Sequence, residues 1–177
     1  LHCGVSANER AFSEITVEHL ENIIFPKLKK IGVEYITLSG GEPFLRKDLP
    51  LVIAMLKEKG FKVRVLTNGT LSEEDSIKKL VYAGLRDVSL SLDTLKPEKQ
   101  DYIYNSKDTF VKIMRAVDLF STHVPKKGRL LLINTVVSPF NIEELPELAL
   151  FAKKKGYYIS FVPVESNGFS EFRFTEN

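Results

Sequence analysis

The sequence predicts an α/β fold with parallel strands, arranged as a partial (βα)6-type barrel. Five short segments rich in β-branched and aromatic residues alternate with helical patterns. The predicted strands begin near residues 34, 62, 87, 129 and 158, which leaves room for a helix and two loops between neighbouring strands. Strands joined by helical crossovers lie parallel. A complete eight-stranded barrel takes about 250 residues, so five strands in 177 residues indicate a partial barrel or an open sheet.

The predicted elements follow in chain order. The strands occupy 33–38, 62–67, 87–92, 129–137 and 157–164, and the helices occupy 16–32, 48–60, 72–84, 109–120 and 141–156. Thr16 is expected to open the first helix and Pro26 to kink it. Acidic residues in the first turn of the third helix suit the positive end of the helix dipole.

The sequence favours a single domain core over 1–165, followed by a C-terminal tail of uncertain structure over 166–177. The chain opens on a loop and a helix, whereas a parallel βα array is expected to open on a strand. We therefore expect that the first strand of the barrel is missing from this chain.

Composition narrows the class of protein. The chain is 44% hydrophobic and 27% charged with a net charge of +2, which is typical of a globular domain and excludes a disordered tail. No apolar run approaches the roughly 18 residues of a membrane span. There is no signal-peptide pattern, and no basic cluster of the kind that binds nucleic acid. The single cysteine, Cys3, excludes an internal disulfide framework, and we expect a cytoplasmic protein.

Candidate ligand-binding residues gather where the predicted strands end, because ligands of parallel βα folds bind at the C-terminal ends of the strands. Gly40 and Gly41 allow a sharp bend and a close approach of the backbone to a ligand, and Glu42 adds a carboxylate suited to an amine or a cation. The alternative is a tight turn with a solvated glutamate. The segment 67–69, Thr-Asn-Gly, could likewise be a simple turn.

Three polar residues end the next two predicted strands. Ser91 and Asp93 offer a hydroxyl and a carboxylate that could bind a sugar or an amino acid, although Asp93 could instead cap its loop. Asn134 lies within an apolar strand, so its carboxamide needs a ligand or a buried backbone partner.

The order of these segments resembles the radical S-adenosylmethionine (radical SAM) family. The chain has GGEP at 40–43, TNG at 67–69 and SLD at 91–93. The later stretches INTVVSPFNIEEL and YISFVPVE resemble strands of the subgroup that includes the molybdenum-cofactor cyclase and the peptide-modifying enzymes. Each motif is weak alone, but the order and spacing together are specific, and the resemblance runs from Cys3 to about Glu165.

The resemblance implies an enzyme that reductively cleaves S-adenosylmethionine (SAM) at a four-iron, four-sulfur cluster. The resulting 5′-deoxyadenosyl radical would modify a peptide, a cofactor precursor or another organic substrate, and an electron donor such as flavodoxin or ferredoxin would be a partner. Cys3 would be the last cysteine of a C-x-x-x-C-x-x-C loop and would bind one iron as thiolate. The other two cysteines would precede Leu1.

The same resemblance implies the cofactor-binding residues. The GGEP segment would hold the methionine amino group of SAM, and Ser91 would contact its carboxylate or ribose with Thr67 nearby. Asn134 and Val164 would lie close to the ribose and the adenine. The full expected set is Gly40, Gly41, Glu42, Pro43, Thr67, Asn68, Ser91, Asp93, Asn134 and Val164.

Two interpretations from other classes stay open at this stage. One is a cluster-free βα-barrel module that binds a small molecule or a phosphate through Gly40, Gly41 and the adjacent helix start. The other is a half-barrel lyase or phosphate-binding protein of ordinary βα type. The substrate is open in each case.

Overall fold

The fold is a five-stranded parallel sheet in a computed structural model, which describes residues 15–164. The strands lie in the sheet in their chain order, β1-β2-β3-β4-β5, so each strand pairs with the next one in the sequence. Each pair of neighbours is parallel, as the sequence predicted. The strands are β1 (Tyr35–Leu38), β2 (Lys62–Thr67), β3 (Asp87–Ser91), β4 (Leu130–Val137) and β5 (Tyr158–Pro163).

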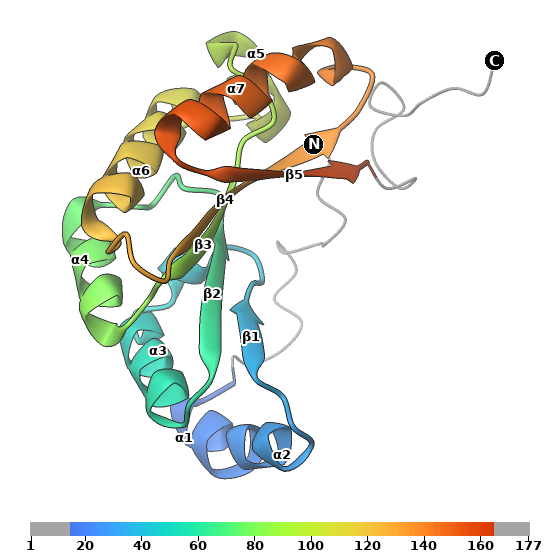
Figure 1. Cartoon of the computed structure of the whole chain (residues 1–177). Helices are drawn as coiled ribbons and strands as arrows, with labels where there is room; N and C mark the ends of the chain where they lie inside the picture. The colour runs from blue at the N-terminus through green and yellow to red at the C-terminus, as the bar shows by residue number, and fades with distance from the viewer. Residues whose placement is uncertain (1–14, 165–177) are drawn as a thin grey trace.

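The long helices lie side by side along one face of this sheet (Figure 1). Along this face, α3 contacts α4, α4 contacts α6, and α6 contacts α7. The helical elements are α1 (Val17–His19), η1 (Leu20–Ile24), α2 (Phe25–Lys30), η2 (Pro43–Leu45), α3 (Leu49–Glu58), α4 (Glu74–Ala83), α5 (Pro97–Tyr104), α6 (Thr109–His123), η3 (Ile142–Glu144) and α7 (Leu145–Lys155).

Side chains alternate along each strand, so the two faces of the sheet carry different residues. In one row of paired residues, Val65, Val88 and Leu131 are at most 1% exposed and belong to the core beneath the helices. The preceding residue of each strand points to the opposite face, because successive side chains of a strand alternate. That opposite face, called the inner face below, carries Arg64 and Asp87 and is not covered by the long helices.

The first helical stretch is continuous but irregular. Thr16 caps it as predicted, because its hydroxyl accepts a hydrogen bond from the backbone N–H of His19 at 3.1 Å. At Pro26, where a kink was predicted, the structure has a π-helical turn, η1, directly before α2. Proline has no N–H to donate to the preceding turn, and π turns accommodate such a local mismatch.

Two differences from the sequence prediction concern helices. Helix α5 was not predicted, although Pro97 in its first turn and Glu98 beside it are typical of a helix start. Helix α6 continues to His123 rather than ending at 120. Within residues 15–164, no helix is long and apolar enough to cross a membrane.

Candidate active site

The candidate site lies at the rim where the five parallel strands end. Glu42 is the residue that joins the first two segments of this rim. One oxygen of its carboxylate accepts hydrogen bonds from the backbone N–H of Phe44 (3.1 Å) and the hydroxyl of Thr67 (2.7 Å). The other oxygen accepts from the backbone N–H of Asn68 at 2.8 Å. Since each carboxylate oxygen has two acceptor positions, the second oxygen keeps one position for a donor beyond these contacts.

The TNG segment is an ordered turn. The Asn68 side chain accepts hydrogen bonds from the backbone N–H and the hydroxyl of Thr70, at 2.9 and 2.7 Å. The hydroxyl of Thr67 also accepts from the N–H of Gly69 at 3.0 Å. The segment is therefore a turn and also contacts GGEP, because the Thr67 hydroxyl and the Asn68 backbone N–H both donate to Glu42.

Gly40 is the open position of the rim. Its φ of +145° is one that side chains rarely adopt, and a Cβ placed there would have no neighbour within 4 Å among residues 15–164. The GGEP segment also borders a cavity of about 450 Å³ between the first helical stretch and β1, with mainly aliphatic walls. In the part of the chain that the structure describes, space is therefore free next to the Gly40 backbone for a ligand.

A polar row crosses the inner face just below the rim. Ser91 pairs in register with Asn134, and Asn134 pairs with Ser160 of β5. The residues before them in β4 and β5, Ile133 and Ile159, pack with the core, so the row faces the other way. The sequence identified the first two members of the row, whereas Ser160 was missed because a lone serine in an apolar strand carries no motif.

Asp93 lies at the same end of the sheet but is 1% exposed. Its carboxylate accepts a hydrogen bond from the backbone N–H of Val136 at 2.7 Å, and its backbone carbonyl accepts from the side chain of Asn141 at 2.7 Å. The same Asn141 amide donates to the carbonyl of Val136 at 2.9 Å. Asp93 and Asn141 therefore bind the end of β3 to the end of β4.

Two further residues that sequence reasoning missed complete this connection. The side-chain oxygen of Gln100 accepts from the backbone N–H groups of Asp93 and Thr94, at 3.0 and 3.1 Å. Glu144 accepts from the Thr94 hydroxyl and from the ammonium groups of Lys99 (2.6 Å) and Lys96 (2.9 Å). No local pattern in the sequence marks these contacts, because each joins residues of different loops.

The electrostatics of Glu144 follow from these partners. Burial alone would raise the pKa of its carboxyl group, but hydrogen bonds from Lys99, Thr94 and Lys96 outweigh burial and hold the pKa below its usual value of 4.5. The charged form of Glu144 is therefore the form that stabilises the fold.

Val164 directly follows β5, and its backbone N–H donates to the carbonyl of Val137 at 2.9 Å. The Cys3 prediction lies outside the described residues. Within residues 15–164 there is no group of three or more His, Cys, Asp or Glu side chains that could hold a metal ion. The GGEP segment does fit an amine-bearing ligand, because of the spare acceptor position at Glu42 and the open side of Gly40.

Comparison with known families decides the identity of the chain. The family model described as the radical SAM superfamily matches residues 1–152. The chain belongs to the radical SAM superfamily. Enzymes of this family use a four-iron, four-sulfur cluster and SAM, so the expected fold, family and cofactors are confirmed at the level of the family.

The chain is similar in sequence to curated enzymes that are named for different reactions. The chain is 32% identical over 162 residues to a probable GTP 3′,8-cyclase of Methanocaldococcus jannaschii, which covers 81% of the chain and 53% of that protein. It is 33% identical to an Fe-coproporphyrin III synthase of Methanosarcina barkeri, over 84% of the chain and 36% of the relative. The chain therefore spans about half or less of the length of these relatives.

Solved structures share the fold. SuiB of Streptococcus suis bound to S-adenosylmethionine matches with a TM-score of 0.78 at 20% identity, over 96% of the chain and 39% of SuiB. A structure of anSMEcpe with bound AdoMet and a peptide matches with a TM-score of 0.72 at 22% identity, over 92% of the chain and 48% of anSMEcpe. These matches support the partial barrel predicted from the sequence.

Proposed function

We propose that the chain is the core of a radical SAM enzyme that modifies a peptide, a cofactor precursor or another organic substrate. When bound, the cluster and SAM would supply one chemistry, the one-electron reductive cleavage of SAM to methionine and a 5′-deoxyadenosyl radical, with Cys3 as an iron ligand and the GGEP segment holding SAM. The observation that carries the proposal is Glu42, which holds GGEP and TNG together and keeps one acceptor position for an ammonium group.

The proposed roles follow the geometry of the rim. Glu42 and the backbone of 40–43 bind the methionine amino group, next to the Thr67–Asn68 turn. Ser91 and Asn134 lie side by side on the inner face and bind the carboxylate or the ribose hydroxyls. Val164 lies near the adenine. Cys3 binds one iron of the cluster as thiolate.

Asp93 has a narrower role in this proposal than the sequence suggested. Its carboxylate is buried and accepts from Val136, so it positions the end of β3, which carries Ser91. We also propose that an electron donor such as flavodoxin or ferredoxin is a partner of the enzyme. The proposed substrate is a peptide or a small organic molecule, and the proposed location is the cytoplasm.

The test uses the full-length protein, reconstituted with iron and sulfide without air and reduced with dithionite. We expect 5′-deoxyadenosine and methionine in equal amounts, and loss of both in a Cys3→Ala variant. A reconstituted protein with the absorbance of a four-iron cluster that yields neither product would contradict the proposal. Binding of a sugar phosphate without binding of SAM would favour the cluster-free alternative.

A further inference from the structure

The inner face of the sheet carries a polar group to which the proposed binding of SAM gives no role. Tyr35 of β1, Arg64 of β2 and Asp87 of β3 lie in neighbouring strands, toward the ends at which these strands begin. The hydroxyl of Tyr35 donates a hydrogen bond to one carboxylate oxygen of Asp87. The backbone N–H of Leu130 donates to the other oxygen at 2.9 Å. The Asp87 carboxylate is therefore engaged by two neutral donors.

The positive charge of Arg64 has no acidic partner in this group. Arg64 pairs in register with Asp87, but none of the ion pairs within residues 15–164 involves Arg64. The guanidinium carbon lies instead 5.2 Å from the centre of the Tyr35 ring, in a cation–π contact. The Nε atom of Arg64 is buried without a hydrogen-bond partner among the described residues. The protein itself therefore leaves the guanidinium incompletely bonded, and an oxyanion would complete it.

The Tyr35 hydroxyl keeps Asp87 away from Arg64. Burial, followed by the hydrogen bond to Asp87, raises the pKa of Tyr35 to about 12, so the phenol keeps its proton at neutral pH. As a donor, it competes with Arg64 for the carboxylate of the adjacent strand. Arg64 consequently presents a free charge on the inner face, and the planar guanidinium suits carboxylates and phosphates.

This group lies below the proposed SAM site on the same face of the sheet. Ser91 lies two rows above Arg64, which is four residues or roughly 13 Å at about 3.3 Å per residue. The row between them includes Leu66, Leu132 and Tyr158, and Tyr158 is 67% exposed. A molecule that extends from the rim to Arg64 would pass apolar and aromatic side chains and meet a positive charge at its far end.

We propose that Arg64 binds an anionic group, a carboxylate or a phosphate, of the organic substrate that the enzyme modifies. The inference rests on the proposed function, because such a substrate lies between Arg64 and the SAM at the rim. Asp87 stays bonded to Tyr35, and the middle row contacts the apolar part of the substrate. The substrate class is therefore an organic anion whose charged group lies roughly 10 Å from the reacting carbon.

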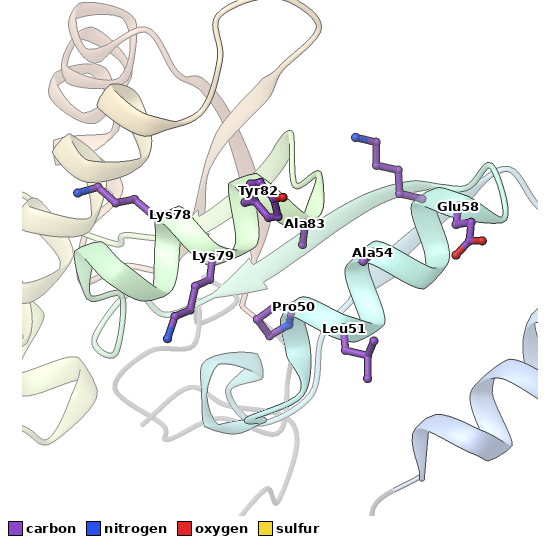
Figure 2. Close-up of a pocket in the computed structure, with 9 residues that line it drawn as sticks. Pro50, Leu51, Ala54, Glu58, Lys78, Lys79, Tyr82 and Ala83 are labelled. Carbon is purple, nitrogen blue, oxygen red and sulfur yellow. The ribbon is translucent and has the colours of Figure 1, made fainter.

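A hollow of about 910 Å³ on the helical side of the sheet provides a control surface. It lies between α3 and α4, and Figure 2 shows Lys78 and Lys79 of α4 beside it. Lys79 is exposed, and the ion pairs of the described part of the chain do not include it. An anion attracted by positive charge alone would bind Lys79 as well as Arg64.

The test titrates the full-length, reconstituted protein by calorimetry with two probes, pyrophosphate for a phosphate group and succinate for a carboxylate. At least one probe should bind with one equivalent, and the tighter one identifies the anionic group. Arg64→Gln should weaken this binding about tenfold, because it removes the charged donors. Arg64→Lys keeps the charge without the planar fork and should give an intermediate affinity. The control Lys79→Gln should bind the probe as the wild type does.

Two further variants separate anion binding from a structural role of Arg64. Tyr35→Phe removes one hydroxyl and frees Asp87 to pair with Arg64, so it should weaken probe binding about threefold. Asp87→Asn removes the competing charge and should tighten probe binding by a similar factor. Both variants retain Arg64, so the opposite shifts test the site even where Arg64→Gln fails to fold.

Binding of neither probe, equal affinity in the wild type and Arg64→Gln, or an equal loss in Lys79→Gln would overturn the anion site. Shifts of the same sign in Tyr35→Phe and Asp87→Asn would overturn it too. A tenfold loss of SAM affinity in Arg64→Gln would assign the residue to SAM rather than to the substrate.

Formation of 5′-deoxyadenosine with dithionite, measured on the same protein, separates the two proposals. A wild type that cleaves SAM but binds neither probe would overturn the role of Arg64 alone. A wild type that binds a probe but forms no 5′-deoxyadenosine would overturn the proposed function, and the substrate role of Arg64 with it.

Discussion

The two sides of the rim use their polar groups differently. On the side of β1 and β2, one carboxylate, Glu42, joins two glycine-containing loops and keeps an acceptor position. On the side of β3 and β4, the buried side chains of Asp93, Gln100 and Asn141 are bonded to backbone groups of the neighbouring segments. Glu42 therefore keeps a position for a ligand, whereas Asp93, Gln100 and Asn141 are engaged with the backbone of the fold.

This difference separates residues that look alike in the sequence. Glu42 and Asp93 are both carboxylates that end a predicted strand in a family motif. Asp93 is 1% exposed, whereas Glu42 is half-buried, and no described residue lies within 4 Å of a Cβ placed at the nearby Gly40. We infer that Glu42 acts on a ligand and that Asp93 acts on the fold, and the following predictions test this division.

The largest effect is expected for Glu42→Gln. The amide nitrogen cannot accept the hydrogen bonds of Thr67 or Asn68 and cannot neutralise an ammonium group. We expect SAM cleavage to fall by about 100-fold, since a hydrogen bond to a charged group contributes roughly 1.5 to 3 kcal/mol. The rate of 5′-deoxyadenosine formation measures this. Glu34→Gln, the same change at an exposed glutamate, is the control and should keep full activity.

Asp93→Ala should act mainly on stability. The substitution leaves the partly buried N–H of Val136 without this acceptor, so the free energy of unfolding should fall by about 2 kcal/mol. Urea denaturation followed by circular dichroism measures it. A variant of unchanged stability that has lost SAM affinity would make Asp93 a ligand residue and remove the division between the two sides.

Much of the fold could be predicted from the sequence, because strand and helix patterns are local. All five strands lie within two residues of the predicted bounds, and Gly84 and Gly156 end helices in the left-handed conformation. Helix α5 was missed because it is short and mostly polar, and only Gln100 and Ile103 of its residues are buried. The apolar periodicity that identified the other helices is therefore weak there.

The site was predictable only where a motif marked it. GGEP, TNG and SLD located the rim, and the strand register brings Ser91 and Asn134 together. The contacts of Asp93 with Val136 and of Thr94 with Glu144 join residues 43 and 50 positions apart. Such pairings depend on the packing of α5 and η3 against the sheet ends, which no local pattern encodes.

Glu144→Gln should change the pH dependence of stability. The folded-state pKa of Glu144 lies below its usual 4.5, so its contribution is present above that value and is lost as the pH falls through the folded pKa. The variant should be less stable by about 1 to 2 kcal/mol at pH 7, because the hydrogen bond from charged Lys99 is weakened. Thermal unfolding from pH 7 to pH 3 measures it, and the two proteins should converge at the acid end. A constant difference across this range would contradict the role given to the charge.

The smallest effect on stability is expected for Gly40→Ala. The φ of +145° strains any side chain, but no neighbour would clash, so the cost should be about 1 kcal/mol. Gly128→Ala is the matched control, because Gly128 also has a positive φ and open surroundings but lies outside the rim. Both variants should lose stability in urea, and only Gly40→Ala should bind SAM more weakly by equilibrium dialysis. Equal SAM affinity in the two variants would remove Gly40 from the site.

The division between Glu42, which acts on a ligand, and Asp93, Gln100 and Asn141, which hold the fold, is tested most directly by hydrogen–deuterium exchange of the full-length, reconstituted protein with and without SAM. We predict that SAM slows exchange in segments 39–45 and 67–70, while exchange in 93–96 and 136–142 is already slow without SAM and changes little. Protection that appears on SAM addition in 93–96 and 136–142, with none in the GGEP and TNG segments, would contradict the account.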